Sequence, residues 1–346
     1  MFGERGQGRY RRAAAATLIV AGLAGTAACA GDDPTAAPIV VSPPASTGPP
    51  PASAAASPSP GFQAGLGAGP SKSPSRSPSP SPPPAKAPDG RTVLATDFER
   101  ATAGTPYGKG EWAADGWAAE WELGMSGRAR ADATAAHSGS RALRVDYPKG
   151  EIGPEKSGAQ APFPLDPRRD YFVSQWVRFG PGFSFGTTNF AGKVGLGLAG
   201  GDSCSGGQAC DGTNGFSSRL IWGRDGKASI YYYSMDHESQ YGDAADINLT
   251  WPQDRWVNVV QRLTVNTVSG GAANPDGAIE VWVNGARTAH ITGLRFVSNG
   301  DQVDSAYFSS FAGGGDTTFA PRADSHILYD DLEVSTGWPA TAAARR

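Results

Sequence analysis

Histidine, cysteine and net charge are all scarce in this chain, and each scarcity excludes a class of function. Among 346 residues there are four histidines and three cysteines, and the formal net charge is -3. The histidines are widely scattered and lack the paired spacing of zinc ligands; they are His137, His237, His290 and His326. A chain without a basic excess has no field that would attract nucleic acid. We therefore expect no metal, no other cofactor and no nucleic acid partner.

Large apolar residues are almost missing from the first quarter of the chain. From Ala30 to about Asp89 the sequence consists mainly of Pro, Ser, Ala and Gly. Such a stretch cannot bury enough apolar surface to fold, and its prolines favour an extended chain. We interpret residues 29–89 as a disordered tether and residues 90–340 as the folded domain.

Long hydrophobic runs are lacking too, and the apolar run near the N-terminus is short. It extends from Ala13 to Ala28, about 16 residues, whereas a transmembrane helix needs roughly 20. Basic residues precede it, so we interpret residues 1–28 as a signal peptide. The small residues before Cys29 resemble the lipobox of bacterial lipoproteins, which predicts a lipid anchor on Cys29 at the cell surface. Plain secretion after cleavage near Ala28 is the alternative.

The other two cysteines lie close together in the second half of the chain. Cys204 and Cys210 are in a Gly/Ser-rich segment. Outside the cytosol, cysteines at such a short spacing can be oxidised to a disulfide. We expect that pairing here, and it leaves Cys29 for the lipid.

Apolar residues after about residue 91 recur in short blocks, and helical periodicity is missing. We expect strands at residues 93–98, 142–147, 171–179, 216–222, 228–234, 256–265, 278–283 and 327–334. Turn residues separate the blocks, and Asn284-Gly285 is a strong hairpin signal. Many short antiparallel strands predict an all-β domain, an antiparallel β-sandwich of the jelly-roll or lectin-like type. We expect it to be a monomer.

Two neighbouring predicted strands carry polar side chains at alternating positions. Ser217 and Arg219 share one face of the first strand, and Tyr231 and Tyr233 share one face of the second. If residues 224–226 form a three-residue loop with its glycine in the left-handed region, Arg219 opposes Tyr231. Ser217 then opposes Tyr233. A two-residue loop would instead place Arg219 and Tyr231 on opposite faces.

A tyrosine pair beside an arginine suits β-elimination on a uronic acid. The reaction removes the proton next to a carboxylate, and a cation held at that carboxylate stabilises the developing charge. A nearby cation also favours the phenolate of a tyrosine, which then becomes a usable base. A tyrosine can return a proton to the leaving oxygen. On spacing alone, ordinary packing of aromatic side chains on strands explains the same residues.

Short motifs follow one another from about residue 97 to residue 334. They are Tyr171 to Phe179, Gly182-Phe183, Gly192 to Leu196, Gly200-Gly201, Asn214 to Ser217 with Arg219, Tyr231 with Tyr233, Asp276-Gly277, Val281 to Gly285, Phe308 to Phe311, Gly313-Gly314 and Tyr329 to Asp331. Taken in this order, they resemble the polysaccharide lyase family 14 domain. The Gly-rich insertion with Cys204 and Cys210 and the extra aromatic Tyr232 depart from the family pattern.

The resemblance implies a β-jelly-roll that cleaves a uronic-acid-containing polysaccharide, such as alginate or glucuronan, by β-elimination. It implies an active-site set of Lys193, Ser217, Arg219, Tyr231 and Tyr233. Lys193 and Arg219 would neutralise the substrate carboxylate, and the two tyrosines would share the roles of base and acid. Ser217 would be an orienting hydrogen-bond donor. The expected partner is thus an extracellular anionic polysaccharide.

A binding protein without catalysis is the main alternative. A carbohydrate-binding sandwich would stack sugars on surface aromatics such as Trp222, Trp251 or Tyr241. In a lyase we expect Trp222, Tyr241 and also His237 to border the cleft. Convergence of the cations and tyrosines in one place would favour the lyase.

A glycoside hydrolase is a third possibility, because it would need two facing carboxylates. Asp97 with Glu99, and Asp331 with Glu333, place carboxylates on one strand face each. The same residues could hold a structural calcium ion. Solvated surface charges are the simpler interpretation.

Overall fold

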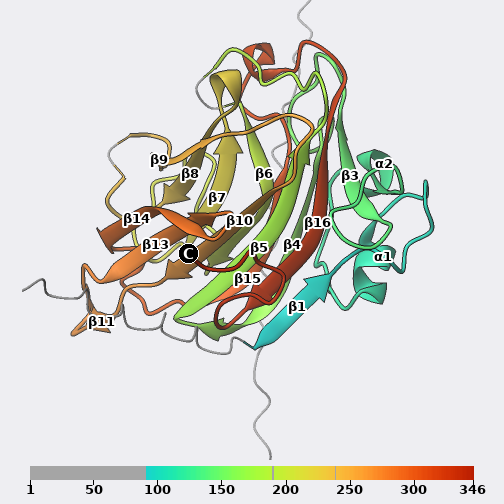
Figure 1. Cartoon of the computed structure of the whole chain (residues 1–346). Helices are drawn as coiled ribbons and strands as arrows, with labels where there is room; N and C mark the ends of the chain where they lie inside the picture. Colours follow the sequence, from blue (N-terminus) through green and yellow to red (C-terminus); the bar gives the residue numbers. More distant parts are fainter. Residues whose placement is uncertain (1–90, 189–190, 238) are drawn as a thin grey trace, which may run out of the picture. The chain divides into compact units, whose positions relative to one another are not determined.

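The computed structural model describes residues 91–346 except 189–190 and 238 (Figure 1). The predicted signal peptide, Cys29 and the tether lie outside these residues. Antiparallel strands form two main sheets, which confirms the predicted all-β sandwich. Within the described ranges, no helix has both the length and the apolar character needed to cross a bilayer.

The larger sheet contains eight strands, in the order β14-β13-β10-β5-β16-β3-β2, with β1 paired to β16. Their bounds are β1 (Thr92–Thr96), β2 (Ala129–Asp132), β3 (Ala142–Tyr147), β5 (Asp170–Phe179), β10 (Val257–Thr264), β13 (Gly277–Val283), β14 (Ala286–Leu294) and β16 (Ser325–Ser335). The first and last strands of the domain are therefore neighbours.

The smaller sheet contains six strands, in the order β4-β15-β6-β7-β8-β9. Their bounds are β4 (Ala159–Arg168), β6 (Gly192–Gly200), β7 (Phe216–Trp222), β8 (Lys227–Tyr233), β9 (Asp243–Thr250) and β15 (Val303–Ser310). Short elements complete the described chain: α1 (Lys109–Ala114), α2 (Met125–Arg128), β11 (Val268–Ser269), β12 (Ala272–Ala273) and 3-10 turns at Arg224–Gly226 and Thr317–Phe319.

One hydrophobic core fills the space between the two sheets. Val177 and Phe179 of β5 belong to the same buried cluster as Leu220 and Trp222 of β7. Because side chains alternate along a strand, the odd-numbered residues of β7 point to the opposite, outer face. The outer face of the smaller sheet is therefore free to carry polar chemistry.

The β7–β8 hairpin has the register that a three-residue loop predicts. Arg219 pairs with Tyr231, and Ser217 pairs with Tyr233. Residues 224–226 form the loop, and Gly226 has a φ of 80°. Asp225 also has a positive φ, 58°, so the loop is tighter than the common bulged turn. The prediction that these four side chains share one face is confirmed.

The Asn284-Gly285 hairpin is also confirmed. Val283 pairs with Ala286, and the two residues between them have φ values of 48° and 81°. These left-handed conformations are those of a two-residue type I′ turn. The turn joins β13 to β14 at one edge of the larger sheet.

Several elements were not predicted, and β4 shows why. It contains Pro162, Pro164 and Pro167, residues that cannot donate to a strand ladder. The strand lies at the edge of the smaller sheet, where missing donors are tolerated. The strands β2, β6, β9, β14 and β15 and both helices were missed as well.

The C-terminal segment lies across the outer face of the larger sheet. Trp176 donates its indole N–H to the carbonyl of Thr341 at 2.9 Å, and the N–H of Thr341 bonds to Glu333 at 2.8 Å. The N–H of Ala343 bonds to the side-chain oxygen of Asn258 at 3.0 Å. The packed domain thus continues past residue 340, where we had expected it to end.

Candidate active site

The five predicted catalytic side chains come from three adjacent strands, β6, β7 and β8, of the smaller sheet. Lys193 pairs with Ile221, two residues from Arg219 along β7. Arg219 in turn faces Tyr231 of β8. Directly paired residues of antiparallel strands project from the same face. Lys193, Arg219 and both tyrosines therefore converge on the outer face.

Ser217 holds the guanidinium of Arg219 in place. Arg219 Nη2 donates to Ser217 Oγ at 3.1 Å, and Ser217 Oγ donates to the carbonyl of Cys204 at 2.8 Å. The serine hydroxyl is thus engaged on both sides. We had expected Ser217 to be an orienting hydrogen-bond donor; it donates to the carbonyl of Cys204 and accepts from the arginine.

The two tyrosines form a hydrogen-bonded pair. Their hydroxyl oxygens are 2.9 Å apart, and the Tyr233 oxygen also accepts the backbone N–H of Gly207 at 3.0 Å. Lys193 Nζ lies 5.8 Å from the centroid of the Tyr231 ring and 5.2 Å from that of Phe311. A cation and two phenols thereby meet in one small region.

Tyr307 is a member of this cluster that sequence reasoning missed. It lies on β15 opposite Gly197, and Arg219 Cζ is 6.0 Å from the centroid of its ring. A Cβ atom at Gly197 would lie 2.8 Å from Arg219 Cγ, so glycine is needed for the arginine to cross β6. Tyr307 directly precedes the motif at residues 308–311, but only the pairing of β15 with β6 brings it here.

The two cations of the site have no acidic partners. Arg219 is only 6% exposed, and its Nε atom has no hydrogen-bond partner. Within the described part of the chain, no carboxylate forms an ion pair with Lys193 or Arg219. A buried charge without a partner is costly, so such a pair of cations is suited to receive an anionic ligand.

Burial and mutual repulsion shift the titration of these groups. Burial, and to a smaller degree the charge of Arg219, lower the pKa of Lys193 to about 7. Burial raises the pKa of Tyr231, as does its hydrogen bond with Tyr233, and these effects outweigh the opposing charge of Arg219. Arg219 thus acts on this tyrosine in the expected direction, but the pKa of Tyr231 is raised overall. Tyr231 is a neutral phenol, which is the state of a proton donor.

The loop before β7 closes one end of the site. Cys204 and Cys210 form the expected disulfide. The backbone N–H of Cys210 donates to His237 Nε2 at 3.4 Å, and the His237 ring lies 5.6 Å from the Tyr233 ring. His237 thus borders the tyrosine pair, although its contact with a sugar stays a prediction.

Two of the aromatic residues proposed for sugar binding are not on the surface. Trp222 is 1% exposed and packs against Tyr147 and Phe183 in the core, so its assignment as a substrate contact is wrong. Trp251, considered for the binding protein, is 2% exposed. Tyr241 is 56% exposed and stays a candidate for substrate binding.

The carboxylates considered for a hydrolase or a calcium site are occupied elsewhere. Glu99 accepts the backbone N–H groups of Ser140 and Arg141. Asp331 contacts His137 at 2.6 Å, and buried Glu333 bonds to Thr341. Asp331 and Glu333 lie on β16 of the larger sheet, and Asp97 and Glu99 follow the end of β1 in the same sheet. Lys193 lies on β6 of the smaller sheet. Among the residues with described coordinates, no three His, Cys, Asp or Glu side chains are placed to share a metal ion.

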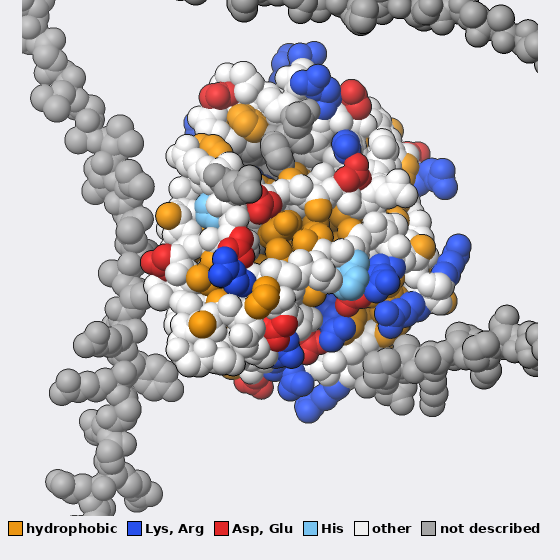
Figure 2. All heavy atoms as spheres, turned by 90° about the vertical axis from the view of Figure 1, so that its left-hand side faces the viewer, with side chains coloured by type: hydrophobic (Ala, Val, Ile, Leu, Met, Phe, Trp, Pro, Cys, Tyr) orange, Lys and Arg blue, Asp and Glu red, His pale blue; other side chains and the backbone are white. Residues whose placement is uncertain are grey.

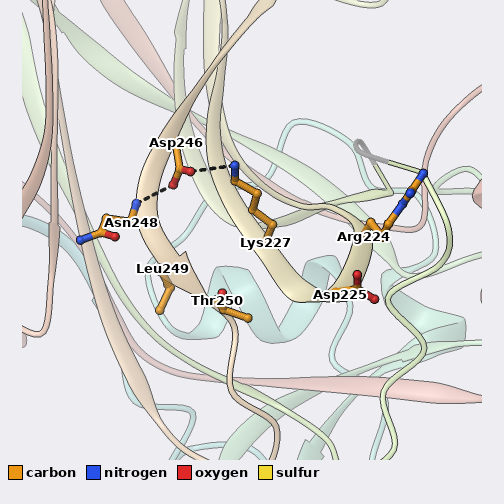
Figure 3. A pocket seen from close by; sticks show the side chains of 7 residues that line it. All are labelled: Arg224, Asp225, Lys227, Asp246, Asn248, Leu249 and Thr250. Carbon is orange, nitrogen blue, oxygen red and sulfur yellow. Dashed lines mark hydrogen bonds and ion pairs between the residues drawn. The ribbon is translucent and has the colours of Figure 1, made fainter. Parts of the chain in front are cut away.

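A hollow lies on the smaller sheet near the β7–β8 turn (Figure 3). Lys227 and Asp246 form an ion pair of 2.8 Å across it. Lys227 is paired with Asp246, and Arg224, the other cation of this hollow, is exposed, so the hollow lacks a buried unpaired charge such as that of Arg219. We do not assign the reaction to it.

One side of the domain, on the left of Figure 1 near β9 and β14, is shown from the front in Figure 2. Hydrophobic side chains lie in a hollow near its middle, and acidic and basic side chains are interspersed around them. Basic side chains are most frequent at the lower right of this view, with acidic ones between them.

Comparison with known proteins places the domain in a family. The Polysaccharide lyase 14 family model matches residues 135–332, a range that contains all five predicted catalytic residues. No curated protein sequence is significantly similar to the chain.

Several solved structures share the fold. The alginate lyase Aly36B has 23% identity and a TM-score of 0.58, and the match covers 70% of this chain and 95% of that one. The marine alginate lyase from Aplysia kurodai has 22% identity and a TM-score of 0.58, over 70% and 98% of the two chains. The alginate lyase vAL-1 from Chlorella virus has 17% identity and a TM-score of 0.55, over 70% and 99%.

Proposed function

The chain belongs to the polysaccharide lyase 14 family, and on that premise we propose that the cluster around Arg219 cleaves a uronic-acid-containing polysaccharide by β-elimination. The observation that carries the proposal is a pair of cations, Lys193 and Arg219, that form no ion pair with a carboxylate of the described residues and lie beside two hydrogen-bonded phenols. The alginate lyases with the same fold support a polyuronate as the substrate class.

In the proposed reaction, Arg219 and Lys193 bind the carboxylate of one uronic acid residue. A base removes the C5 proton, and the electron pair forms the C4=C5 double bond while the C4–O bond breaks. The two cations stabilise the enolate-like charge on the carboxylate. The leaving oxygen takes a proton, so that one new hydroxyl and one unsaturated sugar are formed.

The tyrosine pair supplies the proton transfers. Tyr231 is partly exposed and Tyr233 is 1% exposed, so Tyr231 is the phenol nearer to the substrate. Their 2.9 Å hydrogen bond allows a proton to pass between them. The N–H of Gly207 stabilises negative charge on the Tyr233 oxygen. Ser217 keeps the Arg219 guanidinium oriented.

Purified domain incubated with alginate, glucuronan and related polyuronates tests this function. The unsaturated product absorbs ultraviolet light, so turnover is read directly. Tyr233→Phe should abolish turnover and leave the fold intact, as judged by thermal unfolding. No signal from any polymer would leave only a carbohydrate-binding role, and full activity of Tyr233→Phe would remove that residue from the mechanism.

We also propose that the enzyme acts outside the cell, held there by a lipid on Cys29 and the tether of residues 29–89. The Ala-rich run before Cys29 and the Pro/Ser-rich composition after it support this arrangement. Cys29→Ser should release the protein from the membrane fraction without changing the activity of the domain. Retention of the variant on membranes would contradict the lipid anchor.

A further inference from the structure

An exposed tryptophan lies in the segment that hydrogen-bonds to the edge strand of the smaller sheet. Trp121 is 42% exposed and precedes the residues that match the family, which begin at residue 135. The N–H of Glu120 donates to the carbonyl of Pro162 at 3.1 Å, and Leu123 exchanges backbone hydrogen bonds with Gln160 of β4. Residues 120–123 thus add to the edge of this sheet.

Trp121, Tyr307 and Arg219 form a row of side chains on the outer face of the smaller sheet, and Arg219 belongs to the candidate active site. Its ring lies 5.9 Å from that of Tyr307, and the Tyr307 ring lies 6.0 Å from Arg219 Cζ. Tyr307 pairs with Pro162 on one side and Gly197 on the other, so the row crosses β4, β15 and β6. A glycan held at Arg219 and extended along this row reaches Trp121 as the next aromatic surface.

The charge of the site changes sign along this row. Glu120 directly precedes Trp121, and Asp304 lies on β15, three residues from Tyr307. Asp304 accepts the N–H of Gly201 at 3.2 Å, and Asp301 lies beside the same glycine. Burial, together with the charges of Asp301 and Glu120, raises the pKa of Asp304 to about 6. None of them forms an ion pair with a Lys or Arg side chain in the described ranges. Lys109 bonds only to the backbone carbonyl of Glu120.

We propose that Trp121 forms a subsite for an uncharged sugar beside the uronic acid bound by Lys193 and Arg219. This inference rests on the proposed lyase function and narrows its substrate to a polysaccharide in which neutral sugars flank the uronic acid. The indole face packs against the apolar face of a sugar ring. A second uronate at this position would meet carboxylates of its own sign, which disfavours it.

A polyuronate and its partly carboxyl-reduced derivative test the proposal, because reduction of some carboxyls to primary alcohols leaves the linkages unchanged. Per remaining uronic acid, the wild type should cleave the reduced polymer with the higher kcat/KM. Trp121→Ala should lower kcat/KM on the reduced polymer about tenfold, or about 1.4 kcal/mol, and on the parent polymer much less. Trp121→Tyr should restore most of the loss. Glu120→Gln should raise the rate on the parent polymer.

The controls separate this subsite from the lyase function itself. Val93→Ala removes another exposed apolar side chain, 39% exposed on β1 of the larger sheet, and should leave both rates unchanged. Equal losses on both polymers in Trp121→Ala, or a wild-type preference for the parent polymer, would overturn the subsite and leave the lyase standing. If neither polymer is cleaved, calorimetry with a fully carboxyl-reduced oligosaccharide decides: equal affinity of wild type and Trp121→Ala overturns the subsite.

Discussion

Each of the two sheets carries an arginine on its outer face, but only the arginine of the larger sheet is paired with carboxylates. On the larger sheet, Arg262 forms ion pairs with Asp170 at 2.8 Å and Glu280 at 3.3 Å. On the smaller sheet, Arg219 is more deeply buried and contacts a serine and aromatic rings instead. A paired charge supports the fold, whereas an unpaired buried charge is held at a cost to the fold and is suited to bind a ligand.

The outer faces of the two sheets also differ in the segments of the chain that cover them. The C-terminal segment lies over the larger sheet and hydrogen-bonds to buried Glu333 and Asn258. Over the smaller sheet, the disulfide loop contacts only one end of the row, at Ser217 and Tyr233. Glu333 and Asn258 on the first face are bonded by the C-terminal segment, whereas Lys193 and Arg219 on the second form no ion pair with a described carboxylate.

Replacing Arg219 and, separately, Arg262 by methionine is the strongest test of this comparison, and the largest effect is expected for Arg219. Arg219→Met should lower kcat/KM about 10³-fold, because the developing charge loses its main stabilising cation. Its free energy of unfolding should stay the same or rise, since an unpaired buried charge is removed. Steady-state kinetics and urea unfolding measure the two effects.

Arg262→Met is the matched control on the other face. It leaves Asp170 without its cation and Glu280 with Arg287 alone, so the free energy of unfolding should fall by up to about 1 kcal/mol while kcat/KM is unchanged. If Arg219→Met destabilised the domain more than Arg262→Met, the distinction between a functional and a structural arginine would be lost.

Lys193, the second cation of the site, gives the proposed activity a pH dependence. Burial and Arg219 lower its pKa to about 7, so Lys193 is charged below that pH and neutral above it. A neutral lysine no longer attracts the substrate carboxylate, so kcat/KM should fall about tenfold per pH unit above about pH 7. Lys193→Arg should move this fall to much higher pH, because arginine stays charged. An identical profile in both proteins would assign the titration to another group.

Glu333→Ala tests the outer face of the larger sheet, and we expect its effect to be smaller than that of Arg219→Met. Its carboxylate is fully buried and accepts the hydroxyl of Thr92 at 2.7 Å and the N–H of Thr341 at 2.8 Å. Removal leaves both donors unsatisfied and should lower the free energy of unfolding by about 2 kcal/mol, with activity unchanged. Asp254→Asn, which removes the charge of a largely exposed partner of Arg178 and suits the left-handed backbone there, should have little effect on either. Lost activity in Glu333→Ala would show that this face also serves the reaction.

Sequence alone predicted the parts of this contrast that depend on local geometry. The loop at residues 224–226 determines the β7–β8 register, so Arg219 and Tyr231 could be placed together. The prediction of Trp222 as a substrate contact overlooked the same alternation, because Trp222 lies three residues from Arg219 and therefore on the opposite face. Nothing local pairs β15 with β6, so Tyr307 became part of the site only in the folded structure.

The disulfide loop should give the smallest effect, because it acts on the site through its backbone. The bridge joins Cys204 and Cys210, six residues apart, and the loop supplies the carbonyl that binds Ser217 and the N–H that binds Tyr233. Replacing both cysteines by serine should lower kcat/KM a few-fold, since these contacts become less ordered but are not removed. Reductant should reproduce the loss in the wild type and have no effect on the double variant. If reduced and oxidised wild type are equally active, the loop does not position the site, and the strands of the smaller sheet alone hold its side chains.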